Sequence, residues 1–181
     1  MAGLVFSVGM IGCKGKKAAA PPEGEVEVKM YCSGPDYFSN DEFFRANAVG
    51  ESLDQMTSKK KAMSNAKADL ASSINTTIKA TIDNYVNSRE VNNVEQVNER
   101  FESLTREVVN QQLVGVKTIC EKMTKTANGN YKTYLAIELS GDDLANKINE
   151  RLSKDAQLKV DYDYEKFKQT FDEEMRKMEN N

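Results

Sequence analysis

Three cysteines have the most clearly defined chemistry in this chain. Cys13 ends an uncharged apolar run, which makes its thiol a candidate for acylation. Cys32 and Cys120 lie further along, where they either form a disulfide in an oxidising compartment or stay apart as small buried thiols. No two cysteines have the spacing of zinc ligands, and histidine is absent. The sequence therefore argues against a metal site and excludes catalytic triads that need a histidine base.

Residues 1–12 form an apolar segment that ends at Cys13. The segment is shorter than the roughly 20 apolar residues that span a bilayer, and it fits the hydrophobic region of a signal peptide. Its last residues, MIG followed by Cys13, resemble the lipobox at which bacterial lipoproteins are cut and acylated. We expect a signal peptide over 1–12, acyl chains on Cys13 and a tether over 13–30. The alternative is a short buried apolar arm, or a plain signal peptide beside an unmodified cysteine.

The composition predicts one modest domain and no enzyme. Of the 181 residues, 39% are apolar and the net charge is −3, so the chain as a whole has no electrostatic signature of nucleic-acid binding. No nucleophile and base are recognisable as a pair, and we expect no catalytic residue and no cofactor. Asp161, Asp163 and Glu165 lie close in sequence but lack the spacing and glycine of a calcium loop, so we interpret them as a helix N-terminus.

Two long helices are predicted in the first half of the domain. Over 56–88, apolar residues recur at steps of three or four. The expected core positions are Met63, Ala66, Leu70, Ile74, Ile78, Ile82 and Tyr85. Over 91–110, the apolar residues Val94, Val97, Phe101, Leu104 and Val108 step alternately by three and four. This second stripe suits packing on the domain's own sheet, or a short coiled-coil contact with a partner.

Alternating apolar residues predict three strands. Residues 113–123 and 131–139 alternate across the signal Asn128-Gly129, which predicts a hairpin with a two-residue type I′ turn. A further strand is expected over 45–54, where small residues suit a close approach of another backbone.

Two more helices are predicted after the hairpin. Ser140 is the expected N-cap of the first, whose core face is Leu144, Ile148 and Leu152. The last covers about 161–178 and is amphipathic, so it docks either on this domain or on a partner. The predicted fold is α+β: a small antiparallel sheet, with a hairpin at about 113–139, packed against two long helices and followed by two further helices. We assign 31–160 to the domain and 161–181 to a C-terminal helical segment.

An aromatic-rich segment precedes the first strand. Tyr31, Tyr37, Phe38, Phe43 and Phe44 are candidates for binding a protein partner, since aromatic side chains often anchor interfaces. The alternative is a strap of chain that closes a small core.

Several short motifs resemble the LPP-twenty family of small outer-membrane lipoproteins. They are FRA at 44–46, GES at 50–52, NAK at 65–67 within the long helix, and GNYKTY at 129–134. The resemblance covers about 31–145. It implies an α+β domain similar to the N-terminal domain of flagellar assembly protein T, an envelope location, and no defined catalytic residues.

Of the family's functional features, only the acylated cysteine carries over, at Cys13. The expected function is that of a lipid-anchored envelope lipoprotein with a structural or assembly role. The expected contacts are the outer membrane, through the acyl chains, and either another envelope protein or a second copy of the chain. The alternative is a lipid-anchored module that binds a cell-wall or extracellular ligand. Which face of the membrane it occupies stays open.

Overall fold

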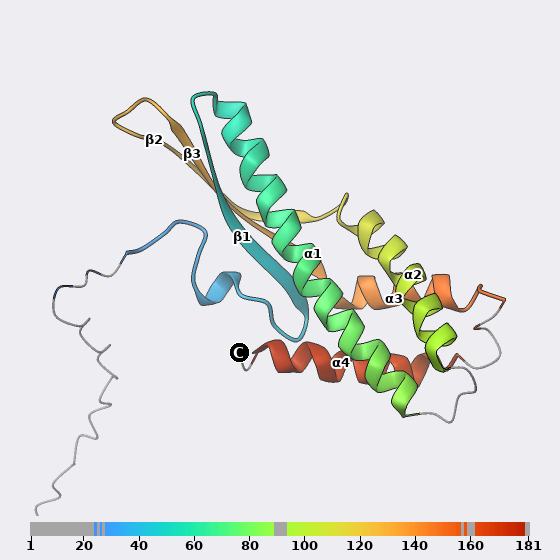
Figure 1. The fold of residues 1–181 in the computed structure, drawn as a ribbon. Coiled ribbons are helices and arrows are strands. Elements are labelled where there is room, and N and C mark those ends of the chain that lie inside the picture. The colour runs from blue at the N-terminus through green and yellow to red at the C-terminus, as the bar shows by residue number, and fades with distance from the viewer. Residues whose placement is uncertain are drawn as a thin grey trace, which may run out of the picture.

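The computed structural model describes Gly24, Val26, residues 28–88, 94–156, Leu158 and residues 162–179. The predicted signal peptide, Cys13 and most of the tether lie outside these residues. The described chain has an α+β fold with a small antiparallel sheet, as the sequence predicted. The sheet has three strands in the order β1-β3-β2 (Figure 1). The elements are a short 3-10 turn (Pro35–Tyr37), β1 (Phe43–Ser52), α1 (Gln55–Asn87), α2 (Val94–Gln112), β2 (Lys117–Lys125), β3 (Tyr131–Ser140), α3 (Gly141–Leu152) and α4 (Tyr164–Glu179).

The predicted hairpin is present as β2 and β3, but the predicted turn is wrong. Of the two central residues only Gly129 has a positive φ, of 85°, whereas a type I′ turn needs it at Asn128 as well. The loop is longer than a two-residue turn because Thr126 forms two hydrogen bonds with the backbone of Asn130, and these bonds close it. The Thr126 backbone N–H donates to the Asn130 carbonyl at 2.8 Å, and the Thr126 hydroxyl accepts from the Asn130 N–H at 3.1 Å.

The long helix α1 covers one face of the sheet over β1 and β3 (Figure 1). Asp54 caps its first turn by accepting a hydrogen bond from the Thr57 N–H at 2.7 Å. Gly50 of β1 lies directly beneath the helix. A Cβ at this position would meet the backbone of Ser58 and Ala62, so only glycine permits the observed approach. The expected close backbone approach is thus confirmed.

The sequence predicts that the second helix packs on the sheet, but α2 does not lie there. Instead α2 packs against α1 and α3, because α1 extends beyond the sheet and its C-terminal half needs a helical cover (Figure 1). The predicted stripe of α2 is buried at Phe101, Leu104 and Val108, in the same core as α1. The stripe is therefore covered within the domain, but by helices and not by the sheet.

The last two helices complete the core. Ser140 caps α3 as predicted, accepting from the Asp143 N–H at 3.2 Å. Helix α4 docks on its own domain: Phe171 packs on Phe44 of β1 with ring centroids 6.3 Å apart. Asp163 accepts a hydrogen bond from the Lys166 N–H at 3.2 Å, which agrees with its interpretation as part of a helix N-terminus.

Candidate functional site

The face of the sheet opposite α1 is crossed by the strap, which we define as residues 30–42. Its first anchor is a disulfide between Cys32 and Cys120 of β2, whose Cα atoms are 5.5 Å apart. Cys120 adjoins an irregularity in the β2–β3 register. Next to the disulfide, Tyr31 packs edge-on against Tyr134 of β3, with ring centroids 5.4 Å apart. The two candidate cysteines therefore meet where the strap reaches the sheet.

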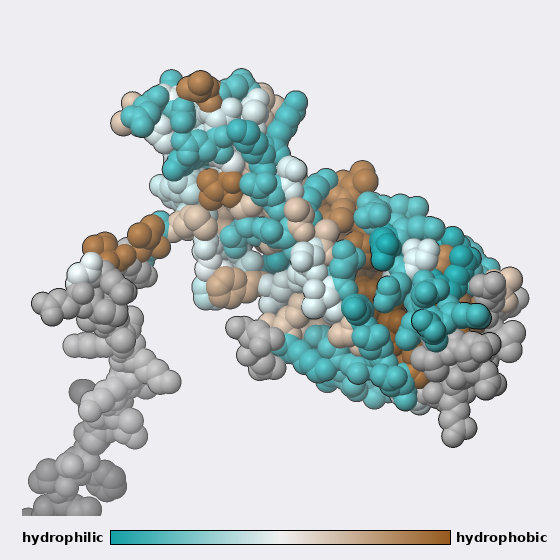
Figure 2. All heavy atoms as spheres, viewed as in Figure 1, coloured by the Kyte–Doolittle hydropathy of each residue, from teal (hydrophilic) through white to brown (hydrophobic). Residues whose placement is uncertain are grey.

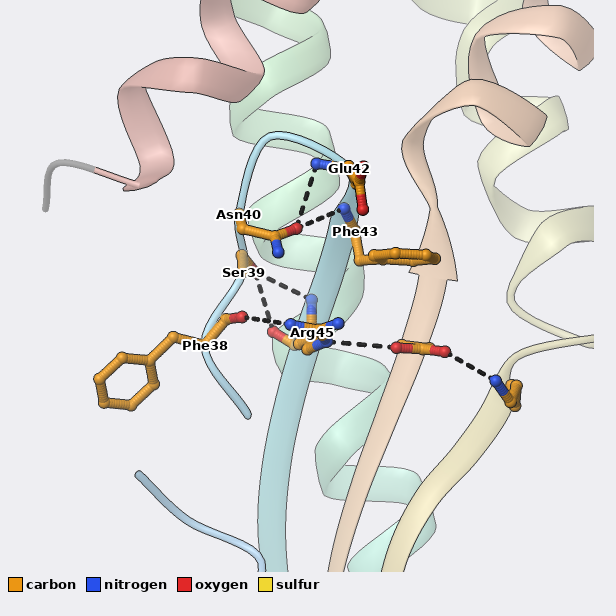
Figure 3. Close-up of polar contacts among 8 residues, drawn as sticks. Phe38, Ser39, Asn40, Glu42, Phe43 and Arg45 are labelled. Carbon is orange, nitrogen blue, oxygen red and sulfur yellow. Dashed lines mark hydrogen bonds and ion pairs between the residues drawn. The ribbon is translucent and has the colours of Figure 1, made fainter. Parts of the chain in front are cut away.

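The second half of the strap binds the outer edge of β1 (Figure 3). The Ser39 hydroxyl accepts from the Arg45 N–H at 2.9 Å and donates to the Arg45 carbonyl at 3.1 Å. Asn40 accepts from the Phe43 N–H at 2.8 Å, and the Phe38 carbonyl accepts from the Arg45 guanidinium at 3.3 Å. Side chains of the strap thus satisfy backbone groups that an edge strand would otherwise expose.

An ion triad crosses all three strands under the strap. Glu138 of β3 lies opposite Arg45 of β1 and Lys117 of β2 in the two registers, at 3.2 Å and 3.0 Å respectively. Only 11% of the Glu138 side chain is exposed. Burial alone would raise the pKa of Glu138, but hydrogen bonds from Lys117 and Arg45 outweigh it and hold the pKa below its ordinary value of 4.5.

Replacing Glu138 with Gln is expected to lower the free energy of unfolding at neutral pH by about 2 kcal/mol, because Arg45 loses its charge partner. Since the pKa of Glu138 is depressed in the folded state, its contribution is present above about pH 4.5 and is lost as the pH falls through the folded-state value. Urea unfolding of both proteins at neutral and acid pH measures the effect. The difference between them should shrink in acid.

Glu121→Gln is the matched control. Glu121 pairs with Lys59 at 2.9 Å, but both side chains are a third or more exposed. Its replacement should therefore cost less than about 1 kcal/mol. Equal losses for the two variants would show that the ion triad has no special role.

The five candidate aromatic residues differ in how far their side chains are exposed. Tyr31 and Phe38 are 56% and 57% exposed on the strap, while Tyr37 and Phe43 are half-buried. Phe44 is fully buried, so its assignment as a partner-binding residue is wrong. The reason is strand alternation: Phe43 faces the strap side and Phe44 faces the core. The accessible partner-binding candidates reduce to Tyr31 and Phe38.

A groove on α1 was not predicted from the sequence. It has a volume of about 420 Å³ and is lined by Met56, Lys59, Lys60, Met63, Ser64 and Lys67. Leu53 and Met56, at the turn between β1 and α1, are 78% and 58% exposed. One feature of the sequence could have indicated the groove. Its lysines lie outside the core stripe of α1, and so do the apolar residues Leu53 and Met56.

Comparisons with known proteins do not decide the family. No family model matches the sequence, and no curated protein matches it. The resemblance to the LPP-twenty family therefore stays a prediction. Among the described residues, no helix combines the length and hydropathy needed to cross a bilayer, and no three cysteine or acidic side chains are placed to hold a metal ion.

Proposed function

We propose that this protein is a lipid-anchored lipoprotein of the bacterial cell envelope, held in the outer membrane by acyl chains on Cys13, with a non-catalytic structural or assembly role. The observation that carries the proposal is the disulfide between Cys32 and Cys120. Disulfides form and persist mainly in oxidising compartments outside the cytoplasm, which is where a lipoprotein functions.

The position of the disulfide suits an anchored protein. Cys32 lies just beyond the expected tether of 13–30, so the bond joins the end of the tether covalently to the sheet. The chain between Cys13 and Cys32 extends to roughly 60 Å at most, at about 3.3 Å per residue. The domain therefore stays within that distance of the membrane while it contacts other envelope components.

The strap supplies the surface for an assembly role. Tyr31 and Phe38 expose more than half of their area next to the disulfide and the edge of β1. Aromatic side chains held on a rigid support lose little conformational freedom on binding, which makes them effective contacts for a protein partner.

Metabolic labelling with a palmitate analogue tests the anchor. The wild type should incorporate the label and fractionate with membranes, because Cys13 is the expected acylation site. Cys13→Ala should be unlabelled and should leave the membrane fraction. Cys32→Ser, which retains Cys13, is the control and should be labelled like the wild type. Equal labelling of Cys13→Ala would overturn the proposal.

Intact mass of the purified protein gives an independent measurement. The mass should correspond to a chain that begins at Cys13 and carries acyl groups. It should rise by about two daltons on reduction, because the Cys32–Cys120 bond takes up two hydrogens.

A further inference from the structure

One end of the molecule is basic, although the whole chain has a net charge of −3. We call this end the basic tip and define it as residues 51–67 and 121–132. The β1–α1 turn and the β2–β3 loop meet there (Figure 1), and Glu51 of β1 lies opposite Lys132 of β3. The tip contains seven lysines and three carboxylates. The lysines are Lys59, Lys60, Lys61, Lys67, Lys122, Lys125 and Lys132.

Each carboxylate of the basic tip already has a partner. Glu51 binds Lys132 at 3.4 Å and accepts from the Asn130 amide at 2.8 Å, and Asp54 caps α1. Glu121 pairs with Lys59 at 2.9 Å. Other lysines of the tip, including Lys60, Lys67 and Lys122, form no ion pair with a carboxylate of the described residues. The surface charge of the tip is therefore positive.

Helix stability does not explain these lysines. Lys59, Lys60 and Lys61 lie in the second turn of α1, near the positive end of the helix dipole, and the first turn contains no acidic residue. Cations at a helix N-terminus destabilise the helix, whereas acidic side chains there stabilise it. The effect of the dipole falls off within the first turn, so Lys59, Lys60 and Lys61 gain no stabilisation from it.

Apolar side chains are exposed among these lysines. Leu53 and Met56 project at the turn into α1, and Met56 and Met63 line the groove of about 420 Å³ beside Lys60 and Lys67. In the space-filling view this end of the molecule is largely hydrophilic with separate hydrophobic spots (Figure 2). Exposed apolar side chains surrounded by lysines are typical of protein surfaces that enter the interface of an anionic membrane.

The tether brings the basic tip towards a bilayer. The disulfide fixes the end of the tether at Cys120, and β2 continues from there to Lys125 at the tip. Five residues of antiparallel strand span roughly 17 Å. The tip therefore lies close to the point at which the tether joins the domain, and within the reach of the tether it can contact the membrane surface.

We propose that the basic tip docks on the anionic lipid headgroups of a bilayer. Lys60, Lys67 and Lys122 bind the headgroup phosphates, and Leu53 and Met56 enter the interfacial layer. The proposal builds on the proposed function, because the acylated tether supplies the high local concentration of membrane. It adds a defined orientation, in which the sheet end of the domain faces the lipid.

Vesicle binding by the full chain with Cys13→Ala tests the docking without acylation. The protein should bind vesicles containing phosphatidylglycerol more tightly than pure phosphatidylcholine vesicles, and high salt should abolish the difference. Adding Lys60→Glu, Lys67→Glu and Lys122→Glu should weaken binding to the anionic vesicles by about a hundredfold or more. Any contribution from the apolar segment 1–12 and from Lys14, Lys16 and Lys17 is the same in all variants, so the comparison between variants on anionic vesicles reports the basic tip.

The matched control carries the same change in charge away from the tip. Lys79→Glu, Lys147→Glu and Lys154→Glu replace three exposed lysines and should change binding by less than about threefold. Equal binding to the two kinds of vesicle, or equal weakening by the two sets of substitutions, would overturn the docking proposal. Neither result affects palmitate labelling of Cys13, so failure of docking is distinguishable from failure of the anchor.

Discussion

Replacing both Cys32 and Cys120 with serine is expected to lower the free energy of unfolding by about 4 to 5 kcal/mol. The disulfide joins residues 88 positions apart, and closing so long a loop removes much conformational entropy from the unfolded chain in the chain-entropy model. A domain of this size is stable by only about 5 to 15 kcal/mol, so the variant loses a large share of its stability. Urea unfolding of the two proteins, compared at equal pH, gives the difference.

Two controls identify the source of this loss. Reduction of the wild type should reproduce the loss, while Cys13→Ala should leave the unfolding curve unchanged because Cys13 lies outside the bonded pair. Tyr31→Ala removes the ring contact beside the bond but keeps the bond itself, and should cost about 1 kcal/mol. A loss below about 1 kcal/mol in the double variant would contradict the prediction.

Replacing Gly50 with Ala is expected to lower the free energy of unfolding by about 3 kcal/mol or more. Overpacking a well-filled site typically costs about 1 to 3 kcal/mol. The new methyl group would meet the backbone of Ser58 and Ala62, which cannot turn aside as a side chain can. Helix α1 must instead move away from the sheet and loosen its contacts along β1 and β3. Chemical denaturation measures the loss.

Gly115→Ala is the matched control for Gly50→Ala. Gly115 has an ordinary φ, and the nearest atom to an added methyl group is the Gln112 carbonyl oxygen at 3.9 Å. This substitution should leave stability within about 1 kcal/mol of the wild type, or raise it slightly by restricting the unfolded chain. Similar destabilisation by both substitutions would show that the close approach at Gly50 is not what matters.

The helices and the hairpin were predictable because their signals are local. Apolar residues recur every three or four positions from Leu70 to Ile82, which places them on a single face of a helix, and that face must be the buried one. Ser140 followed by two acidic residues likewise marks a helix start, whatever that helix packs against. The spacing in α2 correctly predicted a buried stripe, but contained no information on whether the sheet or α1 would cover it.

The features missed from the sequence depend on contacts between distant segments. In the sequence, Glu138 occupies an ordinary polar position of an alternating strand. Its two charge partners become evident only when the register of all three strands is known. The sequence predicts that the first strand begins at residue 45, two residues after the observed start of β1, so the inward position of Phe44 in the strand alternation is not evident from the sequence. The basic tip combines segments that are far apart in the sequence. The net charge of −3 describes the whole chain, so it does not reveal a local cluster of lysines.

The disulfide also determines how the protein bears mechanical force. If the chain is anchored at Cys13 as proposed, a pull on that end passes from Cys32 directly into Cys120 and bypasses the residues between the two cysteines. The hydrogen bonds of Ser39 and Asn40 therefore need not resist tension. The load enters β2 instead, where the backbone pairing with β3 resists it along the length of the strand. Reduction of this single bond would shift the load to the strap, whose few hydrogen bonds would unpeel one after another.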